Sequence, residues 1–392
     1  MPLSRRYFCF GSLALPALAA PKTPGERPHI LLILADRLPS WILGCYGNHE
    51  VRTPALDRLA QTGLRFLNHL ACAPNPAPGR ATLLTGRTPM QLGDADAASP
   101  AEVPLSKVLE GAGYSCAAAD SAAAAKSLDQ QPAGKPFFMT VDCDHLRPPY
   151  DGVPPKFRDL YAQVKFATFS QEAPAKNAAR DKEMLSDLAL HQRQVAAAVT
   201  TLDDDVAVIL SKLSEKRLLE QTLIIFTSTC GSLLGRHGLW DSAQASDPAN
   251  MFEEVVSTPL MWSWQGHVPP QLTRPELVSA YDLLPTLCEL TGAGLPTRNL
   301  CGRSYLPLAT GKPLPKKQPW RTTVFGHYQN TDMAREKRYK LVLRDQGKGV
   351  GELYDLGVDA RERVNQYENP QFATVRTSLA ADLSRWKQTY SA

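Results

Sequence analysis

The chain of 392 residues is 43% hydrophobic and 21% charged, the balance of an ordinary globular protein with room for one large domain and a smaller one. Its formal net charge of +4 is too near neutral to suggest a nucleic-acid partner. No apolar run approaches the roughly 20 residues that a membrane span needs.

Residues 1–20 predict an export signal. Arg5 and Arg6 form a twin-arginine pattern, a modest apolar run follows, and Ala17-Leu18-Ala19 supplies a small-residue cleavage site. We therefore expect an exported protein, periplasmic or extracellular. The eight cysteines include no Cys-x-x-Cys pair, and cleavage would leave an odd number. We interpret most of them as small buried residues and not as a disulfide framework.

The first half of the chain alternates buried strands with helices. Residues 30–35 are a continuous apolar run, typical of a strand buried on both faces. Thr53 is placed to cap a helix over 54–62, which Gly63 would stop. We further predict strands at 64–67, 114–119 and 137–141, helices at 78–85 and 103–110, and an unstructured connection at 121–135.

The second half continues this pattern and then changes. We predict a helix over 180–213, strands at 223–228 and 259–264, and a helix over 277–290. This alternation predicts an α/β sandwich with a large, mostly parallel central sheet flanked by helices. Short strands at 322–326, 339–343 and 352–354, followed by a helix at 371–388, predict a small C-terminal antiparallel sheet covered by that helix. We place a linker at 312–319, between a domain over 27–311 and a C-terminal subdomain over 320–392.

The candidate site centres on residues 68–87, where a proline-rich loop leads into a helix predicted to start at Pro78. Backbone N–H groups and the positive dipole end at such a start favour an anion. Arg80 would add a bidentate fork for sulfate or phosphate. Ligands of open α/β sheets bind outside the carboxyl ends of the strands. We therefore expect Asp36, residues 142–145, Thr229 and Cys230 to converge on this helix start.

The order of these segments resembles the sulfatase family of the alkaline-phosphatase superfamily. The resemblance is carried by RPHILLILAD, GCYGN, TPALDRLAQTGLRFLN, NHLACAPNPAPGRATLLTGR, TLIIFTSTCGSLLGRHGLW, YDLLPTLCELTGAGLP and GRSYLPLATG. It implies an alkaline-phosphatase-like sandwich and hydrolysis of sulfuric esters. It also implies a formylglycine nucleophile made from Cys or Ser in C/S-x-P-x-R, a calcium ion, and Lys and His groups that bind sulfate and protonate the leaving oxygen.

This chain departs from the family at the nucleophile. An ungapped alignment on Asn68 and Arg80 puts Pro76 at that position, and proline cannot become formylglycine. Cys72 lies nearby, but in its register the arginine position falls on Pro76. We interpret Cys72 as a packed thiol.

The metal position departs as well. The aspartate pair after the first strand is here Asp36 and Arg37, and the later metal-binding segment is Thr229, Cys230 and Gly231. One carboxylate of the usual three remains, whereas calcium takes six to eight oxygen ligands. Arg37 would also bring a fixed cation into the space of the ion. We expect no calcium site, with Asp36 serving as a cap or ion-pair partner.

The acid and sulfate-binding groups are mostly replaced. Residues 120–123 hold neither the Lys nor the His of the family, and Ser242 replaces a further Lys. Either His145 or Arg147 occupies another His position, depending on which residue anchors the alignment. His237 survives, and we favour a structural role for it over a ligand role.

Losing nucleophile, metal and acid together would remove most of the acceleration, since general acid catalysis alone contributes ~10²–10⁴. We interpret the chain as a sulfatase-like pseudoenzyme that could hold a sulfated glycan or another small anion. Two alternatives stay open: a sulfate- or phosphate-ester hydrolase with an atypical nucleophile, with Thr82 the nearest helical hydroxyl, and a structural or partner-binding protein. The anion would be held by four groups opposed mainly by Asp36, namely Arg37, Arg80, Arg147 and His237.

Overall fold

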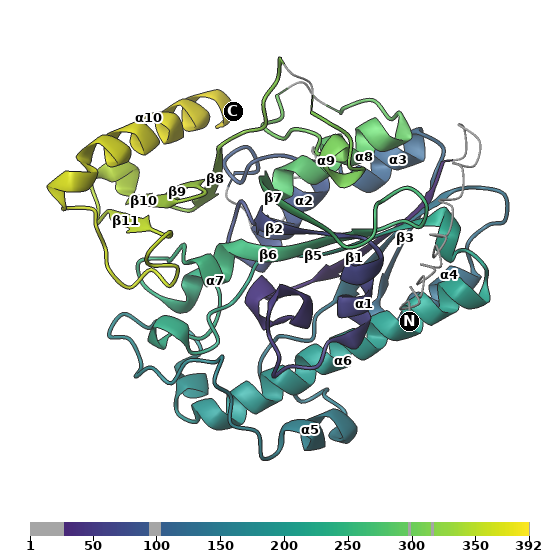
Figure 1. Cartoon of the computed structure of the whole chain (residues 1–392), viewed down its shortest axis with the longest axis horizontal. Helices are drawn as coiled ribbons and strands as arrows, with labels where there is room; N and C mark the ends of the chain where they lie inside the picture. Colours follow the sequence, from purple (N-terminus) through teal and green to yellow (C-terminus); the bar gives the residue numbers. More distant parts are fainter. Residues whose placement is uncertain (1–26, 94–102, 297–298, 315–316, 392) are drawn as a thin grey trace, which may run out of the picture.

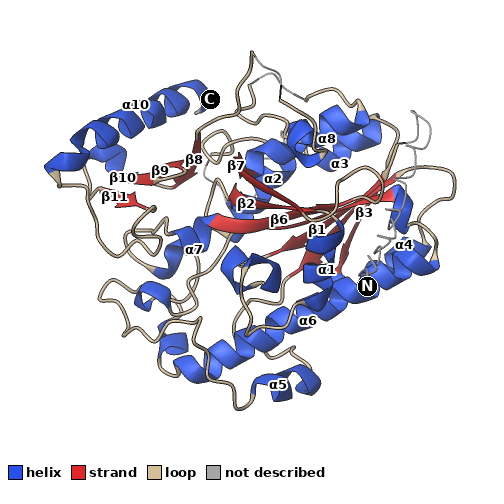
Figure 2. Ribbon diagram, in the orientation of Figure 1, coloured by secondary structure: helices blue, strands red, loops and turns tan. Residues whose placement is uncertain are grey.

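Two β-sheets organise the part of the chain that the computed structural model describes, which is residues 27–93, 103–296, 299–314 and 317–391. The larger sheet has seven strands and the smaller, C-terminal sheet has four (Figures 1 and 2). The predicted export signal at 1–20 lies outside the described residues. None of the helices in the described part combines the length and hydrophobicity that a membrane span needs.

The seven-stranded sheet is mostly parallel, with the strand order β3-β4-β1-β5-β6-β2-β7. Only β6 runs against its neighbours. The central strand β1 pairs Ala35 with Cys143 of β4 and with Ser228 of β5, so the carboxyl ends of these three strands are level. The strands are β1 His29–Ala35, β2 Leu64–Leu70, β3 Ser115–Asp120, β4 Phe137–Cys143, β5 Thr222–Ser228, β6 Ser257–Ser263 and β7 Leu272–Ser279.

Helices cover both faces of this sheet, as the continuous apolar sequence of β1 requires. In β1, Leu31 and Ile33 face one core, while Ile30 and Leu32 face the other. Figure 1 shows α1, α4 and α6 below the sheet and α2, α3, α8 and α9 above it. The helices are α1 Pro54–Thr62, α2 Pro76–Thr85, α3 Leu105–Gly111, α4 Ser121–Asp129, α5 Pro155–Tyr161, α6 Leu188–Glu215, α7 Glu253–Val256, α8 Leu283–Thr291 and α9 Leu306–Ala309.

The four-stranded sheet is antiparallel, in the order β11-β10-β9-β8, and one helix covers it. That helix packs Leu379, Leu383 and Trp386 into a third core, where Trp386 stacks on Phe325 with 5.3 Å between ring centroids. The predicted fold class, an α/β sandwich with a small antiparallel sheet under a helix, is therefore confirmed. These elements are β8 Thr323–Tyr328, β9 Thr331–Glu336, β10 Tyr339–Arg344, β11 Glu352–Asp355 and α10 Ala373–Tyr390.

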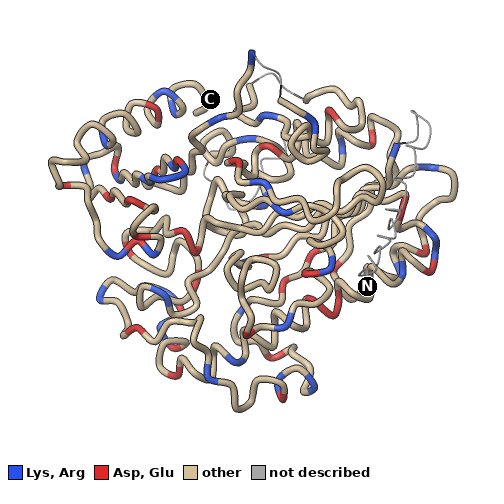
Figure 3. Tube along the Cα trace, in the orientation of Figure 1, with Lys and Arg blue, Asp and Glu red and all other residues tan. Residues whose placement is uncertain are grey.

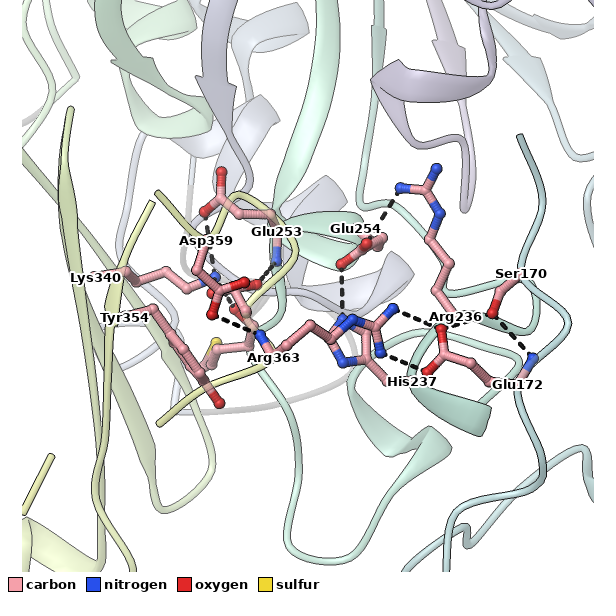
Figure 4. A network of polar contacts seen from close by, with 12 residues as sticks. Ser170, Glu172, Arg236, His237, Glu253, Glu254, Lys340, Tyr354, Asp359 and Arg363 are labelled. Carbon is pink, nitrogen blue, oxygen red and sulfur yellow. Dashed lines mark hydrogen bonds and ion pairs between the residues drawn. The ribbon is translucent and has the colours of Figure 1, made fainter. Parts of the chain in front are cut away.

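A buried network of ion pairs joins the C-terminal sheet to α7 (Figure 4). Lys340 is 0% exposed, and its Nζ donates to Met251 O at 2.7 Å, lies 3.2 Å from Glu253 Oε1 and pairs with Glu362. Arg335 Nη2 lies 3.0 Å from Glu253 Oε2. Burial raises the pKa of Glu362 to about 8. Burial would also raise the pKa of Glu253, but Arg335 and Lys340 outweigh it and lower that pKa to about 2.

A second polar junction is built on Asp282, which is 0% exposed. Its carboxylate accepts from the amides of Ser279 at 2.9 Å and Arg303 at 2.7 Å. The Arg321 guanidinium, from the segment just before β8, donates to both oxygens at 2.9 and 2.7 Å. Asp282 thus ties the start of α8 to the C-terminal sheet.

Several predicted elements need correction. The helix expected at 277–290 begins at Leu283, because residues 272–279 form β7. The helix expected from Pro78 begins at Pro76, and the connection at 121–135 contains α4. The helix expected over 180–213 is a short 3-10 turn, Lys182–Leu185, followed by α6. The sequence analysis also missed β9.

Candidate functional site

The site lies where the level ends of β1 and β5 meet the start of α2. Asp36 follows β1, and its Oδ1 accepts a hydrogen bond from Thr229 Oγ1 at 2.7 Å, just after β5. A Cβ added at Gly79 of α2 would lie 2.3 Å from Thr229 O, so only glycine allows the helix to approach this closely. The predicted convergence of Asp36, Thr229 and the start of α2 is therefore confirmed.

The first turn of α2 has few free backbone donors. Pro76 and Pro78 lack an N–H, and Gly79 N donates to Asn75 O at 2.9 Å. Ala77 is therefore the only one of the first three helical residues that can offer an amide to an anion. Because the helix starts earlier than predicted, its first turn offers fewer backbone N–H groups to an anion than the sequence suggested.

The C-terminal sheet reaches the same turn. The side chain of Asn75, the N-cap residue, donates to the Tyr328 hydroxyl at 3.3 Å, and Gln244 Nε2 also donates to it. Tyr328 ends β8 and is 3% exposed. The second sheet thus contacts the first turn of α2 through Tyr328.

Nucleophilic side chains are buried away from this turn. Pro76 itself is half-buried. Cys72 is 0% exposed, burial raises its pKa well above the ordinary value, and it packs in the core of the C-terminal sheet. Thr82 is also 0% exposed. A packed, protonated thiol agrees with the sequence interpretation of Cys72.

Arg37 follows Asp36 in the chain and is largely buried. Its φ of 57° lies in the left-handed region, and Ser232 Oγ donates to its carbonyl at 3.0 Å. Its Nε donates to Asp241 Oδ1 at 2.9 Å, with side chains 17% and 14% exposed. Its Nη1 is buried, and within the described residues it has no hydrogen-bond partner. A buried, unsatisfied donor costs about 1–3 kcal/mol.

The residues at the metal position do not fit calcium. The Thr229 hydroxyl is committed to Asp36, and burial raises the pKa of Asp36. Cys230 is a buried thiol whose pKa burial also raises. Among the described residues no group of three or more His, Cys, Asp or Glu side chains could hold a metal ion. Position 76, a proline, equally cannot carry formylglycine.

Arg80 forms a bidentate pair with Asp142 of β4, and Arg80 Nη2 lies 3.0 Å from Asp142 Oδ2. The two side chains are 35% and 40% exposed. Solvent and solutes can therefore reach this pair, unlike the Arg37–Asp241 pair.

The two histidines are held by acidic partners. His237 Nε2 lies 3.3 Å from Glu254 Oε2, and its ring stacks on Phe252 with 3.7 Å between centroids. Figure 4 shows His237 among the ion pairs next to α7. His145 Nε2 lies 3.0 Å from Asp205 Oδ2. Both contacts are those expected of structural histidines.

The expected excess of positive charge opposed mainly by Asp36 is wrong. Each of the four proposed cationic groups has its own carboxylate, and Figure 3 shows acidic and basic residues interspersed along the chain. Arg147, 60% exposed, pairs with Asp144 at 3.1 Å. The four pairs are Arg37–Asp241, Arg80–Asp142, Arg147–Asp144 and His237–Glu254.

Sequence reasoning placed Asp142 and Asp144 at the strand ends but missed their pairing with Arg80 and Arg147. It missed Asp241, Glu254 and Tyr328 altogether. Asp241 follows the GRHGLW motif, but nothing in the sequence links it to Arg37. Burial and the charge of Asp241 raise the pKa of Asp181 to about 6.

The sulfatase family model matches residues 28–123 and 116–293, and the model of the N-sulphoglucosamine sulphohydrolase C-terminal region matches residues 235–389. Human arylsulfatase A is 28% identical over 361 residues, which covers 75% of this chain and 70% of the human protein. The ulvan-active sulfatase of Formosa agariphila is 24% identical over 430 aligned positions, covering 92% of this chain and 80% of that protein.

Solved structures share the fold. A protein determined in complex with its substrate D-glucosamine-2-N,6-O-disulfate superposes with a TM-score of 0.80 at 19% identity, covering 93% of this chain and 98% of that one. The phosphonate monoester hydrolase of Agrobacterium radiobacter gives a TM-score of 0.79 at 19% identity, covering 93% and 96%. These likenesses establish the alkaline-phosphatase-like architecture. The family matches extend across both sheets, and the protein belongs to the sulfatase family.

Proposed function

We propose that this protein binds a sulfated carbohydrate or a similar anion at the strand-end site and does not hydrolyse it by the formylglycine–calcium route. The supporting observation is Pro76 at the first position of α2, with Cys72 and Thr82 fully buried behind it. A side chain that water and substrate cannot reach cannot attack a sulfate ester. Arg80, the partly exposed cation at the strand ends, can bind an anion without that reaction.

Two features favour an anion over a neutral ligand. Arg37 adds a positive charge beside the site, although its guanidinium is too enclosed for a ligand to contact directly. Arg80 is partly exposed and shared with a carboxylate that an incoming sulfate can displace. The relatives whose names mention ulvan and a disulfated glucosamine favour carbohydrate as the carrier of that sulfate.

Replacing Pro76 by cysteine should restore the maturation pattern without restoring turnover. With Pro78 and Arg80 in place, the variant carries the full C-x-P-x-R motif. Co-expressed with a formylglycine-generating enzyme, Pro76→Cys should acquire an aldehyde, detected by hydrazide labelling. It should hydrolyse aryl sulfate no faster than the wild-type protein, since the residues present do not fit the calcium ion. Desulfation by the wild-type protein that Arg80→Ala abolishes would contradict the proposal.

Freeing Arg80 should strengthen anion binding. Asp142→Asn removes the competing carboxylate, and one charge-assisted hydrogen bond gained corresponds to about tenfold in affinity. Arg80→Ala should weaken binding by a similar factor. Calorimetric titration with sulfate and with sulfated oligosaccharides measures both changes.

Asp129→Asn is the matched control, because Asp129 pairs with Lys212 and Lys216 on the surface of α4 and α6. It makes the same chemical change away from the site and should leave affinity unchanged. No heat of binding with any of these anions at millimolar concentration, for the wild-type protein and Asp142→Asn alike, would reject the anion-binding proposal.

A further inference from the structure

Arg37 lies between two carboxylates at the end of β1, one next to it in the chain and one in contact with its guanidinium. Asp36 precedes it in the chain, and Asp241 binds its Nε at 2.9 Å. Burial and the charge of Asp241 raise the pKa of Asp181 to about 6, and burial, with a smaller contribution from the charge of Asp144, raises the pKa of Asp36. Two of these carboxylates, those of Asp181 and Asp241, repel each other unless a positive charge lies between or beside them.

The structure holds Arg37 in place at some cost. A non-glycine residue with φ of 57° sits in a region that costs roughly 1–2 kcal/mol. Ser232 donates to its carbonyl, Asp241 accepts from its Nε, and its buried Nη1 has no hydrogen-bond partner among the residues described. An exposed arginine that served only solubility would need none of these features. The surrounding residues therefore determine the position of this guanidinium.

We propose that the Arg37 guanidinium is the built-in cation of this site and takes the place of a divalent ion. The wild-type protein therefore neither binds calcium here nor depends on it for stability. Replacing Arg37 by a carboxylate would add an acidic side chain beside Asp36 and Asp241 and leave Arg80 as the remaining cation that acts on Asp36. Hard oxygen ligands of that kind are those that calcium prefers. This inference does not depend on the anion-binding proposal.

Thermal unfolding and calcium titration test it with five proteins: the wild type, Arg37→Asp, Arg37→Asn, Arg37→Lys and Arg147→Asp. The wild-type protein should unfold at the same temperature in millimolar calcium and in chelator, and should give no calcium isotherm. Arg37→Asp should unfold earlier in chelator and gain a few degrees in calcium, as expected when calcium is about 100 times its dissociation constant. Arg37→Lys retains a positive charge and should stay insensitive to calcium.

Arg147→Asp is the matched control, since it makes the same charge change at a side chain that is 60% exposed and pairs with Asp144. It should show no calcium effect. Stoichiometric calcium binding by the wild-type protein would overturn the inference on its own. A folded Arg37→Asp without a calcium response would also overturn it, as would failure of both Arg37→Asp and Arg37→Asn to fold in calcium. Sulfate titration of the wild-type protein is a separate measurement, so the two proposals can fail independently.

Discussion

Replacing Lys340 by methionine is expected to lower the free energy of unfolding by about 3–5 kcal/mol. The side chain of Lys340 is 0% exposed, and it neutralises Glu253 and Glu362 at the junction of α7 with the C-terminal sheet (Figure 4). In this variant Arg335 can still form its ion pair with Glu253. Glu362 would be left buried without a cation, which is the costly outcome of breaking a buried pair.

Urea unfolding followed by circular dichroism measures this change. Because burial already raises the pKa of Glu362 to about 8, the variant can protonate this carboxyl at low pH and avoid a buried charge. The loss should therefore grow as the pH rises from about 5 to about 9. Lys348→Met, at an exposed lysine in the turn between β10 and β11, should change stability by less than about 1 kcal/mol. An equal effect of both substitutions would show that the buried network does not hold the junction.

Replacing Asp282 by alanine should cost a similar amount, about 3–5 kcal/mol. Four donors converge on its carboxylate, two backbone amides and the two ends of the Arg321 fork. Alanine would leave the amides unpaired and the guanidinium buried with no counter-charge in its former place.

The same urea experiment tests this, with Asp204→Ala as the control. Asp204 is on α6, 47% exposed and paired with Lys156 at 3.0 Å, so its loss should cost at most about 1 kcal/mol. The C-terminal sheet should also become more sensitive to proteolysis in Asp282→Ala, because Arg321 anchors the segment that leads into it. A stability loss below that of the control would contradict the role assigned to Asp282.

The elements that sequence reasoning found are those whose residues carry their own signal. β1 and β5 are unbroken apolar runs, and α1 has a proline at its start and a glycine at its end. β9 was missed because Asp332 and Arg335 make it look exposed, whereas both are buried against His327, Lys387 and Glu253. β7 was missed because it carries Pro275, which an edge strand tolerates.

The site could be predicted only for residues that directly follow the ends of adjacent strands. Asp36 and Thr229 follow adjacent parallel strands, so their meeting could be expected. The pairing of Arg37 with Asp241 joins residues 204 positions apart and depends on how a loop folds back. The contact of Tyr328 with Asn75 depends on how the two sheets dock, which no local pattern encodes.

The two prolines at the start of α2 have a consequence for recognition. A pyrrolidine ring fixes φ in the unfolded chain as well as in the folded one, so this turn loses little conformational entropy on folding. Asn75 and Tyr328 hold it from the other side. The first turn of α2 is thus preorganised before a ligand binds. A ligand that matches its shape binds without an ordering penalty at this turn, and the turn does not adjust to one that does not match.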